Sequence, residues 1–237
     1  AYTVPKMTVE EVKRDYELIK QTDASRPVLM NLTANFMKHK NTYSEAEKQK
    51  MYPGYIANCD AVGFDIYPVY GYNEARGITW VADGVSELRA LAGPKKPLYA
   101  WIETNKGSQW ITYEKQLEVT PQYTRAEVWM AICQGATAIG YFTHIWKPEY
   151  SQFGLPPENV VALKQINDQI TRLAPVLLGP ASQREAEIEL EGELKADVMA
   201  RERDGALYLL CVNYDASDKG GQGRITVGGL KAGTQVE

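Results

Sequence analysis

Apolar residues recur at helical spacing in five stretches of the chain, and short apolar runs lie between these stretches. Val81, Val85 and Leu88, for example, share one face, which indicates a helix that packs against a core. The short runs end at Pro, Gly or polar residues, as strands do. The pattern predicts helices over residues 8–23, 44–58, 78–92, 124–135 and 158–178, and strands over residues 28–33, 61–68, 96–105 and 138–146. We expect Pro53 and Gly54 to interrupt the second helix.

The order of these elements defines two regions. Up to residue 180 strands and helices alternate, which predicts a parallel sheet built from βαβ units. From residue 181 the helical stripe is lost, and Ala206–Asn213 and Arg224–Gly228 are strand-like, with a turn-rich segment at 215–221 between them. We therefore predict an α/β region over residues 1–180 and a small antiparallel β domain, β-sandwich-like and incomplete, over residues 181–237.

The pattern predicts four strand–helix units, whereas a (β/α)8 TIM barrel has eight. The chain begins on a helix and stops within a strand-like pattern at residues 233–237. We therefore expect a portion of a larger architecture. Three arrangements stay open: an upstream half completes a barrel, two half-barrels pair, or the four strands form an open sheet.

The strand over residues 96–105 is apolar at its start and polar at its end. The two-residue period of a strand places four of its side chains on one face, namely Tyr99, Trp101, Glu103 and Asn105. A carboxylate is unusual in a sheet whose faces are covered by helices. In parallel α/β folds, however, the carboxyl ends of the strands carry binding and catalytic residues. Glu103 is therefore either a functional carboxylate or a strand-end charge that reaches water or an Arg.

Composition narrows the classes of function. The chain has 26 basic and 30 acidic residues, a net charge of −4 and no basic cluster, so we expect no nucleic-acid partner. No apolar run approaches the roughly 20 residues that span a bilayer, so we expect no membrane partner. Three scattered cysteines and two histidines favour neither a disulfide framework nor a metal site, and we expect no metal and no cofactor. Fifteen Tyr and five Trp suit flat ligands such as sugar rings.

Three strand ends and one helix resemble a known enzyme class. The segments are Gly63–Pro68, Tyr99–Glu103 and Gly140–Trp146, with Arg125–Ala136 between the last two. Together they resemble the second half of the (β/α)8 retaining glycoside hydrolases, the superfamily of β-galactosidases and many endoglycanases. The resemblance covers roughly residues 8–179 and implies that the strands are strands five to eight of a barrel. A trailing β domain also fits such enzymes.

The resemblance implies roles for several residues. These enzymes carry a nucleophilic Glu at the end of strand seven, which corresponds to Glu103, and often place a Tyr on the neighbouring strand, where Tyr67 would donate a hydrogen bond to it. Trp146 matches the position of an aromatic residue that stacks on the sugar being cleaved. A retaining mechanism also needs an acid/base carboxyl group about 5 Å from the nucleophile. The resemblance places that group on a strand upstream of Ala1.

Further polar residues at the strand ends are candidates for contacts with the substrate. These candidates are Asn31, Asp65, Trp101, Asn105 and His144. Each has a structural alternative, such as an ion pair for Asp65 or a core hydrogen bond for His144. Three loop residues, Glu74, Glu118 and Glu149, could approach the same rim, but nothing in the sequence marks one of them as an acid.

The sequence therefore predicts a glycoside hydrolase that acts on an oligo- or polysaccharide, with an upstream segment or a second chain completing the barrel. One alternative is a non-catalytic carbohydrate-binding or structural fragment. Another is a different (β/α) enzyme that uses Glu103 as a base. A secreted or periplasmic location would suit the leading prediction, although the given chain shows no signal peptide.

Overall fold

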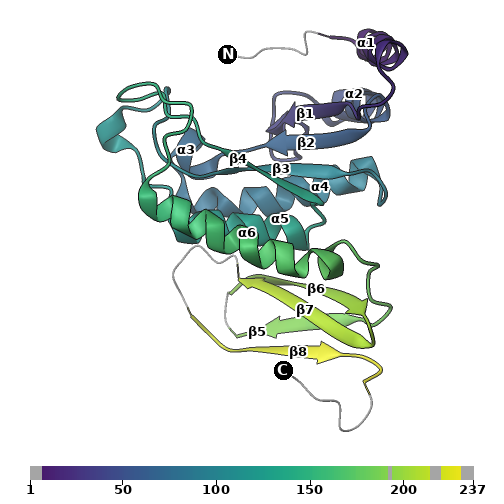
Figure 1. Ribbon diagram of the computed structural model, residues 1–237, viewed down its shortest axis with the longest axis vertical. Coiled ribbons are helices and arrows are strands. Elements are labelled where there is room, and N and C mark those ends of the chain that lie inside the picture. Colours follow the sequence, from purple (N-terminus) through teal and green to yellow (C-terminus); the bar gives the residue numbers. More distant parts are fainter. Residues whose placement is uncertain (1–6, 192–193, 214–219, 231–237) are drawn as a thin grey trace.

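The computed structural model describes residues 7–191, 194–213 and 220–230. They form a parallel sheet packed against helices and, beyond the helices, a smaller antiparallel β region (Figure 1). The elements of the first region are α1 (Val9–Thr22), β1 (Leu29–Thr33), η1 (Ala34–Phe36), α2 (Glu45–Ala57), β2 (Ala61–Asp65), α3 (Pro68–Tyr72), η2 (Ala75–Ile78), α4 (Thr79–Ala92), β3 (Leu98–Glu103), η3 (Tyr113–Lys115), α5 (Pro121–Cys133), β4 (Ala138–Phe142) and α6 (Pro157–Leu177). Among the described residues, no helix is long and apolar enough to cross a bilayer.

The four strands of the main sheet run parallel in the order β1-β2-β3-β4. Asp65 pairs with Trp101 in the register, and Glu103 pairs with Phe142. Each strand lies beside the next strand along the chain, as βαβ units require. The predicted parallel α/β sheet is confirmed. Within the described residues β1 and β4 each pair on one side only, so closure into a barrel is not shown and stays a prediction.

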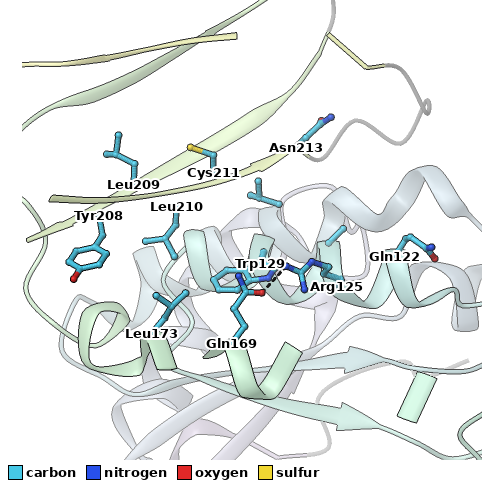
Figure 2. A pocket seen from close by; sticks show the side chains of 12 residues that line it. Gln122, Arg125, Trp129, Gln169, Leu173, Tyr208, Leu209, Leu210, Cys211 and Asn213 are labelled. Carbon is cyan, nitrogen blue, oxygen red and sulfur yellow. Dashed lines mark hydrogen bonds between the residues drawn. The ribbon is translucent and has the colours of Figure 1, made fainter. Parts of the chain in front are cut away.

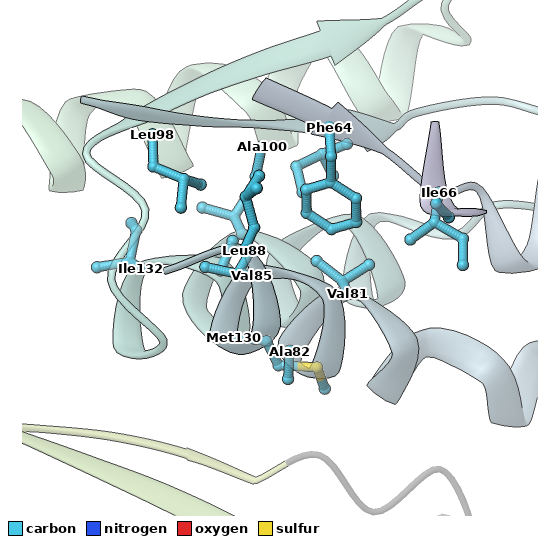
Figure 3. Close-up of a cluster of buried hydrophobic side chains, with 14 of the residues drawn as sticks. Phe64, Ile66, Val81, Ala82, Val85, Leu88, Leu98, Ala100, Met130 and Ile132 are labelled. Carbon is cyan, nitrogen blue, oxygen red and sulfur yellow. The ribbon is translucent and has the colours of Figure 1, made fainter. Parts of the chain in front are cut away.

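The main hydrophobic core lies between this sheet and the helices α4 and α5 (Figure 3). Phe64, Leu98 and Ala100 of the strands are buried against Val85 and Leu88 of α4. Full burial of a large apolar side chain contributes about 1.5–3 kcal/mol. This core therefore determines which face of the sheet packs against the helices. Because successive side chains of a strand point to opposite faces, the side chains between these core residues lie on the other face.

Local signals explain where the first helices begin. α1 starts at a capping box, in which Thr8 accepts the N–H of Glu11 and the Glu11 side chain accepts the N–H of Thr8. The prediction that Pro53 interrupts the second helix is wrong, because α2 continues through it. Tyr52 and Tyr55 are buried on either side of Pro53, and this packing offsets the backbone hydrogen bond that proline removes.

The β region consists of two antiparallel pairs. β5 (Ala186–Leu190) pairs with β8 (Gly223–Val227), and β6 (Ala196–Arg203) pairs with β7 (Ala206–Asn213). Asp204 and Gly205, both with positive φ, form the tight turn between β6 and β7. β6 and β7 lie against α5 and α6. A β-sandwich and the boundary at residue 181 stay predictions. The strand-like pattern at 233–237 and most of the turn at 215–221 lie outside the described residues.

Candidate functional site

Glu103, the last residue of β3, has 0% of its surface exposed. The backbone N–H of Val69 donates to its Oε1 at 2.9 Å, and the N–H of Tyr70 donates to its Oε2 at 2.7 Å. Both amides belong to the first turn of α3, which follows β2, so the carboxylate connects the ends of two neighbouring strands. The described part of the chain contains no hydrogen bond from Tyr67 to Glu103, and both carboxylate oxygens are bound by these backbone amides. A catalytic role for Tyr67 stays a prediction.

A second buried carboxyl group lies beside Glu103. Glu127 on α5 is also fully buried, and neither of its carboxyl oxygens has a hydrogen-bond donor among the described residues. Burial raises the pKa of Glu103 to about 7, although a side-chain hydrogen bond with Glu127 and the N–H groups of Tyr70 and Val69 lower it. Burial, and then the charge of Glu103, raise the pKa of Glu127 well above its usual range. The pair therefore keeps a proton at pH values where a lone carboxyl group is ionised.

Glu127 was not among the residues that the sequence singles out. Its helix, which packs against β3, buries Thr124 and every residue from 127 to 132. A carboxyl group within such a buried run is the signal that could have identified it, because Glu is almost never fully buried without a partner. Thr124 strengthens the same contact, since its Oγ1 donates to the backbone oxygen of Glu103 at 3.1 Å.

Asn31 and Asp65 form a polar pair on β1 and β2. The Asn31 side chain donates to Oδ1 of Asp65 at 2.8 Å. Burial raises the pKa of Asp65, and the bond from Asn31 opposes that shift. Burial, and then the charges of Asp65 and Glu103, raise the pKa of Tyr67. The structure thus brings Asp65, Tyr67 and Glu103 close enough to influence one another, with Asn31 beside them.

A row of aromatic rings continues from Tyr67 to the surface. Tyr67 stacks on Phe142 with ring centroids 4.6 Å apart, and Phe142 meets His144 edge-on at 5.1 Å. His144 lies beside Trp146, which packs against Tyr150 with centroids 5.1 Å apart. Trp146 is 42% exposed and Tyr150 is 61% exposed. The predicted residues Tyr67, His144 and Trp146 therefore belong to one row that opens to solvent at its outer end.

Trp101 is packed on the sheet surface that faces away from the helices. A Cβ on Gly140 would lie 2.3 Å from its ring, so this glycine makes room for the indole. Its Nε1 is buried and has no hydrogen-bond partner among the described residues. Contact between Trp101 and a substrate stays a prediction.

Asn105 lies just beyond β3 and is buried. Its side chain donates to the backbone oxygens of Lys106 and His144, at 3.0 and 3.1 Å, and accepts from Thr104 Oγ1 at 2.8 Å. Thr104 Oγ1 also lies 2.6 Å from the backbone oxygen of Phe142. These bonds hold the end of β3 to the segment after β4. A sugar contact by Asn105 stays a prediction.

The long loop after β3 is closed around the buried side chain of Gln116. Its Oε1 accepts the N–H groups of Gly107 and Ser108 at 2.7 and 3.0 Å, and its Nε2 donates to the oxygens of Ser108 and Ile111 at 2.8 and 2.9 Å. The oxygen of Gly107 in turn accepts the N–H of Trp146 at 2.7 Å. One amide side chain thus fixes the loop beside the exposed end of the aromatic row.

A cavity of about 510 Å³ lies away from the strand ends, between α5, α6 and β7 (Figure 2). Arg125 and Gln169 line it and are joined by a hydrogen bond of 2.7 Å. None of the residues predicted for the substrate site, all of which the structure describes, lines this cavity. In the described part of the chain, no group of three or more His, Cys, Asp or Glu residues is arranged to hold a metal ion.

No family model and no curated protein matches this chain. The β-galactosidase of psychrophilic Marinomonas ef1 aligns with a TM-score of 0.49 and 14% identity, over 70% of this chain and 27% of that enzyme. The β-galactosidase of the Antarctic haloarchaeon Halorubrum lacusprofundi aligns with a TM-score of 0.49 and 17% identity, over 71% and 26%. This chain spans about a quarter of the length of either enzyme, and likeness of this degree does not establish a shared activity.

Proposed function

We propose that this chain carries part of the active site of a retaining glycoside hydrolase that acts on an oligo- or polysaccharide. The observation that carries the proposal is that three features lie together toward the carboxyl ends of the parallel strands. These are the Glu103 carboxylate, the polar pair Asn31–Asp65, and the aromatic row that ends at Trp146. Polar groups that can bind hydroxyls then lie beside rings that can stack on a sugar.

Glu103 is the proposed nucleophile. A nucleophilic carboxylate must be ionised, and the N–H groups of Val69 and Tyr70 favour the ionised form. Attack also requires a carboxylate oxygen to contact the anomeric carbon, whereas Glu103 is fully buried. Phe142 is its register partner and Tyr67 stacks on Phe142, so the proposal requires these two rings to move when a substrate binds.

The acid/base group of the mechanism is proposed to come from an upstream segment or a second chain that completes the barrel. Glu127 does not suit this role, because it lies on a covering helix and has no exposed surface. An acid/base group must reach the oxygen of the leaving group and water in turn.

An activated fluorosugar tests the nucleophile without the acid/base group. The dinitrophenolate of a 2,4-dinitrophenyl 2-deoxy-2-fluoro-glucoside or -galactoside leaves without protonation, so a covalent glycosyl-enzyme forms wherever the nucleophile is competent. We expect the protein to gain the mass of one fluoroglycosyl group, located on Glu103 by peptide mass spectrometry. Glu103→Gln should abolish labelling, and Glu114→Gln, at an exposed position in the loop after β3, should not. Labelling at another residue would refute the assignment.

The complete burial of Glu103 favours one second candidate, a carbohydrate-binding fragment without catalysis. In that case the exposed end of the aromatic row binds sugar, and Glu103 serves the fold by holding α3 to β3. Oligosaccharide binding that is lost in Trp146→Ala, together with no fluorosugar label at any pH, would select this candidate over the hydrolase.

A further inference from the structure

We propose that Glu127 is a positioning residue for Glu103. The two carboxyl groups share one proton, which Glu127 holds and donates to the Glu103 carboxylate. The pairing is inferred from the full burial of both carboxyl groups, from the packing of α5 on β3, and from Thr124, one turn before Glu127, which bonds to the backbone of Glu103. Its consequence for catalysis rests on the proposed function.

The surroundings of Glu127 require that it be neutral. Both of its carboxyl oxygens are buried and find no donor among the described residues. An ionised carboxylate without donors in an apolar site costs several kcal/mol, and such groups take up a proton instead. A protonated carboxyl group then needs an acceptor for its O–H, and the neighbouring Glu103 carboxylate provides one.

The surroundings of Glu103 require that the negative charge of the pair lie there. Its two oxygens accept the N–H groups of Val69 and Tyr70, whereas Glu127 accepts none from the residues that the structure describes. Hydrogen bonds to an ionised group are about twice as strong as those between neutral groups, so the charge settles on the oxygens that have donors. The pair is therefore asymmetric, with the proton on α5 and the charge at the end of β3.

Other titratable groups around the pair do not supply a positive charge. Tyr67 lies close enough for Glu103, Glu127 and Asp65 to raise its pKa, and Tyr70 adjoins it. On α5, Arg125 lines the separate cavity and is bonded to Gln169. In the described part of the chain, no Lys, Arg or His contributes to the pKa of either carboxyl group. The Glu103 carboxylate is thus stabilised by the O–H group of Glu127 and not by any basic side chain that the structure describes.

For the proposed reaction, this arrangement sets the pH at which the nucleophile is available. Glu127 donates to the ionised form of Glu103 and so favours it, and it holds the carboxylate against α5. Removing that donor should raise the pH at which Glu103 loses its proton. It should not change which residue reacts with a fluorosugar.

Carboxyl NMR on the full chain tests the pairing without a substrate. Side-chain ¹³C-labelled Glu would be titrated from pH 4 to pH 10 in the wild type, in Glu127→Gln and in Glu127→Leu. We expect one wild-type carboxyl group to stay protonated above pH 7 and to be absent from both variants. We expect Glu127→Leu, which removes the donor, to raise the proton affinity of Glu103 by about 10-fold, one pKa unit. Glu127→Gln keeps an N–H donor of similar shape and should raise it less.

Two results would overturn the proposal. One is a wild-type spectrum in which every Glu carboxyl group is ionised below pH 6. The other is a Glu103 titration that is the same in Glu127→Leu and the wild type. If Glu127→Leu does not fold, the wild-type and Glu127→Gln titrations still test the pairing, because the carboxyl group that stays protonated above pH 7 should be present in the wild type and absent from Glu127→Gln. In the fluorosugar assay the acidic limb of the labelling rate should move with the NMR titration. Absence of a label on Glu103 would refute the proposed function and leave the pairing to be judged by NMR alone.

Discussion

The backbone N–H of Tyr70 donates a hydrogen bond of 2.7 Å to Oε2 of Glu103, 33 positions away in the sequence. A second bond, from Val69 to Oε1, runs beside it at 2.9 Å. The carboxylate therefore serves as the acceptor for the start of α3. Whatever its role in chemistry, Glu103 also holds two elements of the fold together.

Truncating Glu103 should destabilise the protein. We expect Glu103→Ala to lower the free energy of unfolding by about 2–6 kcal/mol, because two buried N–H groups each lose an acceptor at a cost of about 1–3 kcal/mol. Glu103→Gln keeps one acceptor oxygen and should lose about half as much. Urea denaturation measures both, with the exposed Glu114→Ala as the control. A Glu103→Ala protein as stable as the wild type would contradict this structural role.

Stability should fall as the pH rises from 5 to 8. In the folded chain, burial raises the pKa of Glu103 from 4.5 to about 7 and raises that of Glu127 as well. A carboxyl group with a raised pKa stabilises the folded state fully below its unfolded pKa, and this contribution is lost as the pH rises through the folded value. Urea denaturation at pH 5, 6, 7 and 8 should show the decline, which should be smaller in Glu103→Gln because that variant lacks one of the titrating groups. A stability that increases over this range would be inconsistent with the buried pair.

Asp60 should control how firmly α1 is held. It accepts hydrogen bonds from the N–H of Val28 at 2.7 Å, from the Tyr16 hydroxyl at 2.8 Å and from Lys20 Nζ at 3.1 Å. These bonds, led by that from Val28, lower the pKa of Asp60 to about 2. Its contribution is thus present above the unfolded pKa of 3.8 and is lost as the pH falls toward 2. We expect Asp60→Asn to increase amide hydrogen exchange in α1 but not in α5, and unchanged exchange in α1 would disprove this link.

Trp146 should contribute strongly to carbohydrate binding. A ring that stacks on a sugar contributes on the order of 1.5 kcal/mol, so Trp146→Ala should weaken binding about 10-fold or more. Isothermal titration with cellohexaose and with a β-1,4-galactan fragment would measure the effect. The matched control is Trp110→Ala, since Trp110 is 64% exposed but lies outside the aromatic row. Equal losses in the two variants would show that the row has no special role.

Much of the α/β region could be predicted because its signals are local. The capping box of Thr8 and Glu11 and the apolar stripe of α4 each involve a few neighbouring residues. Strand ends were harder to place. β2 and β4 end at Asp65 and Phe142, earlier than the pattern predicts, because the next residues form α3 in one case and a bridge between Ile145 and Ser151 in the other.

The partners of Glu103 could not be predicted from local patterns. Alternation along a strand places Glu103 on a face but does not say which groups meet it there. Val69 and Tyr70 reach it through the turn after β2, and Glu127 reaches it through the packing of α5 on β3. The sequence carries only an indirect sign of the last contact, a carboxyl group among buried residues of a helix. The roles of the candidate site residues in catalysis and binding stay predictions.

The amide of Gln116 fixes the shape of the loop after β3 by bonding to four backbone groups, and the backbone oxygen of Gly107 in this loop accepts from Trp146. A ligand that binds at Trp146 would therefore contact a loop that is already ordered. Ordering a loose segment on binding costs conformational entropy, and here folding has already met most of that cost.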